Sequence, residues 1–206
     1  MSQDFIFGAF QIIVLIYSVV LHELAHGLMA RSMGDRTAER MGRLTLNPIS
    51  HLDFFGSLVL PFITSQFGLM FGYAKPVPYD PDSLDDRTWG PSKVALAGPA
   101  VNLALAALAG IVMRLWGADM PYIMLLLLQY VVWINIVLAF FNLIPIPPLD
   151  GHWLLMAVLP ARSYALKINL YRYQWLLLAA TIFFVFPLLR PLMGGLFQLL
   201  TGYRPF

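Results

Sequence analysis

The hydrophobic pattern of this chain is dominated by long runs that contain no charged residue. A helix needs about 20 residues to cross the hydrocarbon core of a bilayer. Five runs approach or exceed this length: Phe5–His22, Phe54–Gly72, Val94–Met113, Met120–Leu149 and Tyr173–Leu189. The first reaches it when it continues through Glu23 to Ala30, and the last is followed by another uncharged run, Pro191–Tyr203. The pattern therefore predicts several transmembrane helices.

Two shorter patterns modify this picture. Phe54–Gly72 is interrupted by glycines and a proline, and we expect it to be re-entrant or to lie along the membrane. Arg43–Leu46 alternates like a strand, and the alternate prolines of Tyr73–Tyr79 forbid a helix. The predicted fold is an α-helical integral membrane protein. It is a polytopic bundle of about four transmembrane helices, with one re-entrant or membrane-lying segment and a small membrane-associated β element.

The composition agrees with lipid as the solvent. Hydrophobic residues make up 59% of the 206 residues and charged residues only 12%, about half the charged share of soluble domains. This excludes a disordered chain and a nucleic-acid-binding domain. The absence of cysteine excludes disulfides and thiolate zinc ligands. We interpret residues 1–206 as a single membrane-embedded domain, with a core at 5–155 and an accessory helical region at 173–200.

The end of the first run carries the strongest chemical signal. His22 and His26 are four residues apart, so on a helix they share one face and can bind one Zn²⁺. Glu23 follows the first histidine, where it can act as a general base toward water. An ionised carboxylate inside an apolar run is costly unless it faces a cavity or a partner. These residues therefore favour a catalytic metal site over polar residues at the membrane edge.

A catalytic zinc site needs a third protein ligand. Candidates in or near the apolar runs are Asp53, Asp119, Asp150, His51 and His152. Asp150 is favoured because it follows the proline-rich run Asn142–Leu149, which must unwind the helix. Unwound backbone at membrane depth is tolerated only where it lines a protein or water cavity. His152 is the alternative ligand.

Topology gives an independent test of this ligand set. His22, His26 and Asp150 can meet only if the first and fourth runs point in the same direction, which requires that Phe54–Gly72 does not cross the membrane. In that arrangement ten of the 13 Lys and Arg residues lie on one side, and only Arg114, Arg190 and Arg204 lie on the other. The positive-inside rule then places the N-terminus outside and the metal near the cytoplasmic leaflet.

Three motifs in this order resemble the signatures of site-2 proteases, the M50-type intramembrane zinc metalloproteases. They are His22–His26, Ala97–Asn102 and Asn142–Gly151. Gly42–Pro48 also resembles the segment that follows the first motif in compact prokaryotic members of the family. The resemblance implies a three-helix core with one zinc ion on His22, His26 and Asp150.

The resemblance also implies roles for other residues and for partners. Glu23 would be the general base and Asn142 would help to stabilise the oxyanion, while membrane-associated strands would hold the substrate. The expected function is hydrolysis of peptide bonds in or near transmembrane segments of membrane-protein substrates (regulated intramembrane proteolysis). The expected location is the bilayer of a prokaryotic plasma membrane, with the active site toward the cytoplasm.

Two alternatives stay open at this point. The chain could bind a metal without proteolysis, as a transporter or an inactive scaffold, although a transporter should carry several ionisable residues along a pathway. Asn102 lies among small residues in the third run, where it could either join packed helices or orient a metal ligand.

Overall fold

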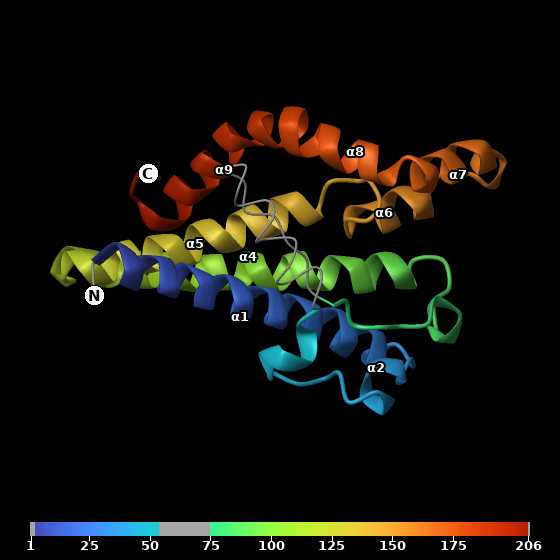
Figure 1. The fold of residues 1–206 in the computed structure, drawn as a ribbon, viewed down its shortest axis with the longest axis horizontal. Helices are drawn as coiled ribbons and strands as arrows, with labels where there is room; N and C mark the ends of the chain where they lie inside the picture. The colour runs from blue at the N-terminus through green and yellow to red at the C-terminus, as the bar shows by residue number, and fades with distance from the viewer. Residues whose placement is uncertain (1–2, 54–74, 206) are drawn as a thin grey trace.

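The computed structural model describes residues 3–53 and 75–205 and consists of long helices (Figure 1). Its long helices are α1 (Gln3–Ser32), α4 (Gly90–Trp116), α5 (Tyr122–Asn142) and a C-terminal run of α8 (Gln174–Ala180), the π-helical turn η6 (Thr181–Val185) and α9 (Phe186–Thr201). Four stretches in these helices, of 21 to 30 residues, are long and apolar enough to cross a membrane. The predicted helical membrane bundle is therefore confirmed in its main elements.

The shorter elements connect these helices. They are α2 (Thr37–Arg40), η1 (Pro48–His51), η3 (Pro81–Ser83), η4 (Gly117–Asp119), α6 (Gly151–Val158), η5 (Ala161–Ser163) and α7 (Tyr164–Arg172). A tight turn, η4, joins α4 to α5, so these two helices are antiparallel neighbours.

Helix α4 is the central helix of the bundle. It packs against α1, α5, α6 and α9. In Figure 1, α1 and α5 run in the same direction and α4 runs opposite to both. The C-terminal ends of α1 and α5 therefore lie at the same end of the bundle, as the three proposed ligands require.

Small residues on α4 allow its close contacts. A side chain at Gly110 would lie 3.0 Å from the backbone of Leu200 on α9. The main apolar core lies between α4, α5 and α9 and includes Met113, Ile136 and Phe197, each at most 1% exposed. This core fixes α4 and α5 relative to each other. It thereby supports the region where α5 ends and α4 begins, which holds the proposed ligands.

Large apolar side chains also cover much of the outer surface. Leu108, Ile111 and Leu115 on α4 are more than half exposed, as are Phe184 and Leu188 in the C-terminal run. Exposed apolar area on this scale is unfavourable in water and is expected where lipid is the solvent.

The predicted β element is not supported, because the described residues contain no strand. Residues 43–47 and 75–80 have no regular secondary structure, and their polar groups bond to other parts of the chain. Pro76 and Pro78 have no backbone N–H, and the N–H of Val77 donates to Glu23 instead of a neighbouring strand. Arg43 donates to the carbonyl of Lys75 at 2.8 Å through its side chain. The prediction for Phe54–Gly72 lies outside the described residues.

Candidate metal centre

Two imidazoles of α1 face the interior of the bundle. His22 and His26 are one helical turn apart and are 6% and 8% exposed. Their Nε2 atoms lie 3.1 Å apart, and their ring planes are perpendicular. The four-residue spacing therefore does place both rings at one point.

The turn after α5 brings a carboxylate to the same point. Asp150 Oδ2 lies 3.0 Å from His22 Nε2 and 3.3 Å from His26 Nε2. The next residue, Gly151, lies so close to the backbone carbonyls of Leu143 and Ile144 that a side chain there would overlap them. The proline-rich run thus folds back tightly on the end of α5, and this turn directs Asp150 at the histidines.

The Nδ1 atoms of the two histidines have other partners. His22 Nδ1 lies 2.6 Å from Asn102 Oδ1, and His26 Nδ1 lies 2.7 Å from the carbonyl oxygen of Val94. Both partners are acceptors, so both Nδ1 atoms donate, and in the neutral imidazoles each Nε2 then presents a lone pair. Two lone pairs and a carboxylate oxygen therefore point at one buried volume.

This donor set fits a divalent cation. Three acceptor atoms within 3.0–3.3 Å repel one another unless a positive charge lies among them. Ligand atoms at zinc distances and tetrahedral angles would be about 3.3–3.4 Å apart, close to these separations. Two histidines and one carboxylate also form a ligand set of catalytic zinc sites that leaves one position open.

A cleft of about 170 Å³ is lined by two of these three residues, His26 and Asp150. Its lining includes Glu23, Tyr79 and Trp153 in addition to His26 and Asp150. Glu23 Oε2 accepts the backbone N–H of Val77 at 2.8 Å, which holds the carboxylate at the edge of the cleft. The volume accommodates a few water molecules, at about 30 Å³ each, or one peptide group.

Gly98 on α4 permits the close approach of α4 to the histidines. A Cβ atom at this position would lie 2.6 Å from Cε1 of His22 and 2.6 Å from Cε1 and Nε2 of His26. Atoms this close would overlap. The glycine of the second sequence motif therefore makes room for the two rings.

The other histidines named from the sequence lie outside this group of three. His152 is buried and its Nδ1 lies 2.6 Å from the carbonyl oxygen of Leu149, while its ring packs against Trp153 and Tyr171. Burial lowers the pKa of His152 and favours its neutral form. His51 is the last residue of η1 and its Nε2 lies 2.9 Å from the carbonyl oxygen of Thr45.

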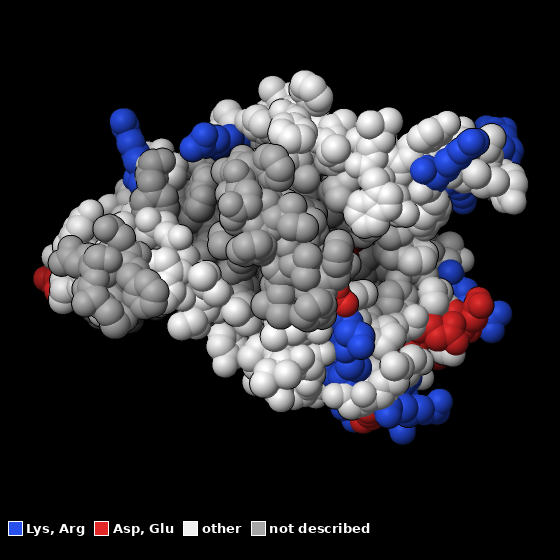
Figure 2. Space-filling view, in the orientation of Figure 1, with Lys and Arg blue, Asp and Glu red and all other residues white. Residues whose placement is uncertain are grey.

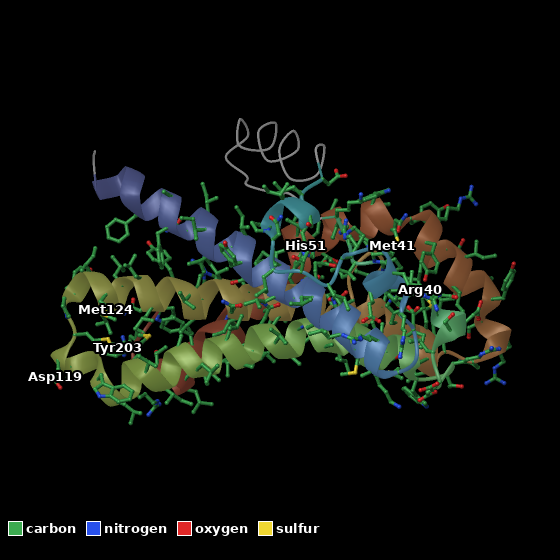
Figure 3. All side chains as sticks on the ribbon, turned by 90° about the horizontal axis from the view of Figure 1, so that it is seen from below. Arg40, Met41, His51, Asp119, Met124 and Tyr203 are labelled. Atoms are coloured by element: carbon green, nitrogen blue, oxygen red, sulfur yellow. The ribbon has the colours of Figure 1, made fainter. Side chains whose placement is uncertain are left out.

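The remaining sequence candidates have different surroundings. Asn142 donates through Nδ2 to the carbonyl of Leu138 on its own helix at 3.0 Å. Asp119 lies at the turn between α4 and α5, at the opposite end of the bundle (Figure 3). Asp53 follows η1, and the metal-ligand group found among the described residues does not include it.

Sequence reasoning missed two polar residues behind the histidines. Asn135 on α5 and Ser18 on α1 are 1% and 4% exposed, and both are hydrogen-bonded to Asn102 or to each other. Ser18 precedes His22 by four residues and so shares its helix face, a signal present in the sequence. For Asn102, the contact with His22 supports the orienting interpretation.

The profile of peptidase family M50 matches residues 10–120 and 108–187. A Bacillus subtilis protein named "Putative zinc metalloprotease YwhC" is 38% identical over 156 residues, which cover 72% of this chain and 68% of YwhC.

More distant relatives carry similar names. A Mycolicibacterium smegmatis protein named "Putative zinc metalloprotease Rip2" is 31% identical over 70% of this chain. A Methanocaldococcus jannaschii protein named "Putative zinc metalloprotease MJ0611" is 32% identical over 72% of this chain and 73% of its own length. This chain spans only 56% of the length of that Rip2. No solved structure matches the chain.

Proposed function

Because this chain belongs to peptidase family M50, we propose that it is an intramembrane zinc metalloendopeptidase of the HExxH type. It would hydrolyse peptide bonds in or near transmembrane segments of membrane-protein substrates. The four long apolar helices and the family assignment are those of an integral membrane protein, so the substrate would reach the site within or beside the bilayer.

The observation that carries the proposal is the convergence of His22 Nε2, His26 Nε2 and Asp150 Oδ2 beside the Glu23 cleft. These three residues would hold one Zn²⁺. When bound in such a site, zinc polarises a carbonyl oxygen and lowers the pKa of water toward neutrality.

The protein side chains would carry out the proton transfers. Glu23 borders the same cleft as His26 and Asp150, so its carboxylate can accept a proton from the attacking water and return it to the leaving amine. Asn142 uses one Nδ2 hydrogen on Leu138, and its second hydrogen would donate to the oxyanion of the tetrahedral intermediate.

The orientation in the membrane is part of the proposal. The site lies toward the end of the bundle where α1 and α5 finish, and Figure 2 shows most Lys and Arg side chains gathered toward the end that carries α2 and α7. By the positive-inside rule, this end would face the cytoplasm of a prokaryotic cell.

The decisive experiment is cleavage of a single-span membrane substrate by the purified chain in vesicles. We expect zinc-dependent cleavage by the parent, loss on chelation, and loss of activity in Glu23→Gln. Glu39→Gln is the matched control, because Glu39 pairs with Arg31 away from the cleft. Cleavage at the parent rate by Glu23→Gln would contradict the proposal, and zinc binding without cleavage in the parent would favour a non-proteolytic metal-binding protein.

A further inference from the structure

A row of buried polar side chains extends from His22 into the middle of the bundle. Asn102 on α4 is 0% exposed, and its Nδ2 donates to Asn135 Oδ1 on α5 at 2.8 Å and to the Ser18 carbonyl on α1 at 3.3 Å. Asn135 Nδ2 donates in turn to Ser18 Oγ at 3.0 Å and to the Val131 carbonyl at 2.9 Å. The row therefore joins the three helices α1, α4 and α5.

The hydrogen bonds of this row have only one consistent direction. If the Asn102 amide were reversed, its Oδ1 would face the Ser18 carbonyl oxygen and Asn135 Oδ1, and two acceptors would be opposed without a proton. Asn102 must therefore present Oδ1 to His22, and His22 Nδ1 must be the donor at 2.6 Å. In the neutral ring, which is the form that binds a metal, the lone pair of His22 is then on Nε2, the atom that faces Asp150 and His26.

We propose that Asn135 and Ser18 are positioning residues that act through Asn102 to hold His22 as a metal ligand. The inference rests on the proposed function, because it assigns a role to residues behind the proposed zinc site. The Nδ1 of His26 is held by a backbone carbonyl, that of Val94, so the orientation of this ring does not depend on a side-chain acceptor. His22 has only a side-chain acceptor, so its orientation depends on the groups that hold Asn102.

The burial of these groups supports a specific role. Polar side chains inside membrane helices are costly unless they are satisfied by a partner, and those in functional sites pair with one another. Outer hydrogen-bond partners of a metal-binding histidine typically contribute about 10–100-fold to metal affinity. Asn135 is connected to His22 through two successive hydrogen bonds, so we expect its contribution to metal affinity to lie near the lower end of this range.

The test measures binding of Co²⁺ to the full chain in detergent, by chelator competition and by the visible absorption band of the bound ion. Asn135→Leu should weaken Co²⁺ binding about tenfold and change the band. Thr201→Val is the matched control, because Thr201 is 1% exposed and its hydroxyl donates to the backbone carbonyl of Phe197, within α9. It should leave Co²⁺ affinity and the band as in the parent, whatever it costs in thermal stability.

Coupling provides the second readout. Since Asn135 is proposed to act through Asn102, the Asn102→Leu/Asn135→Leu double variant should bind Co²⁺ no more weakly than Asn102→Leu alone. Folded Asn135→Leu with the parent affinity and band would overturn the proposal. If Asn135→Leu does not fold, Ser18→Ala decides the question. A severalfold weaker affinity supports the row, and an unchanged one overturns it.

These measurements distinguish failure of the positioning role from failure of the proposed function. A parent chain that binds no Co²⁺ or Zn²⁺ would refute the metal site, and with it both proposals. A parent that binds the metal and cleaves substrate, with variants unchanged in affinity, would refute the positioning role alone.

Discussion

At Gly98 the addition of one methyl group should disrupt the arrangement of the two histidines. The alanine Cβ would lie 2.6 Å from atoms of both His22 and His26, and neither ring can swing away without losing its Nδ1 hydrogen bond. We predict that Gly98→Ala lowers zinc affinity by at least about tenfold and reduces cleavage at limiting zinc, while the chain still folds. Metal competition and a cleavage assay over a zinc titration measure this directly.

The matched control is another helical glycine. Gly195 on α9 has no atom within 4 Å of the position of an added Cβ, and Gly195→Ala removes a residue of low helix propensity. It should leave zinc affinity and cleavage unchanged. Parent-like zinc affinity in Gly98→Ala would show that α4 can move away from the histidines, contrary to the packing described above.

At the scale of elements, the sequence indicated the helices, the ligand cluster and Asn102 as a possible partner, but not Asn135 and Ser18 behind it. His22, His26 and Asp150 could be predicted from the sequence, because helical spacing and a run of prolines constrain the local geometry. Asn135 carried no such signal, since an asparagine in an apolar helix is compatible with ordinary packing. The prediction of strands was wrong because of a tertiary contact. The backbone N–H of Val77 donates to the side chain of Glu23, 54 residues earlier in the chain, and not to a neighbouring strand.

The connection that follows α1 depends on a second carboxylate. Asp35 is 2% exposed and accepts hydrogen bonds from the backbone and hydroxyl of Thr37 and from the backbone of Asp80. Burial opposes the charged form, but these hydrogen bonds outweigh it and lower the pKa of Asp35 below its ordinary value of 3.8. Its contribution to stability is therefore complete above that value and is lost as the pH falls through the lowered pKa.

We predict that Asp35→Asn lowers the thermal midpoint at pH 7 and that the difference from the parent narrows below about pH 4. Unfolding in detergent from pH 7 to pH 3, with both proteins free of metal, provides the measurement. Asp82→Asn, at an exposed position of η3, is the control and should follow the parent throughout. A difference for Asp35→Asn that does not narrow between pH 7 and pH 3 would assign the effect to packing.

For the whole molecule, a bound metal would act as a cross-link between α1 and the turn after α5. A ligand that binds only the folded chain stabilises it, by about 2.7 kcal/mol at a free concentration 100 times Kd. We predict that Zn²⁺ raises the thermal midpoint of the parent by several degrees and that chelation reverses the shift. In Asp150→Ala the shift should be absent or much smaller; an equal shift would place the bound zinc elsewhere.

The bundle also predicts which residues share a side of the membrane. Asp119 lies at the turn between α4 and α5, whereas Arg40 lies on α2 beyond the end of α1 (Figure 3). The chain has no cysteine, so a single introduced thiol can be labelled without background. In sealed, oriented vesicles, a membrane-impermeant maleimide should label Arg40→Cys and Asp119→Cys from opposite sides.

A third thiol makes the topology test specific. Ser163, in η5 before α7, follows α5 and the Asp150 turn, so Ser163→Cys should label from the same side as Arg40→Cys. This result requires α1 and α5 to point the same way, which is the condition for one metal to reach His22, His26 and Asp150. Labelling of Ser163→Cys from the side of Asp119→Cys would separate the histidines from Asp150 by the width of the bilayer, and the metal centre would then be impossible.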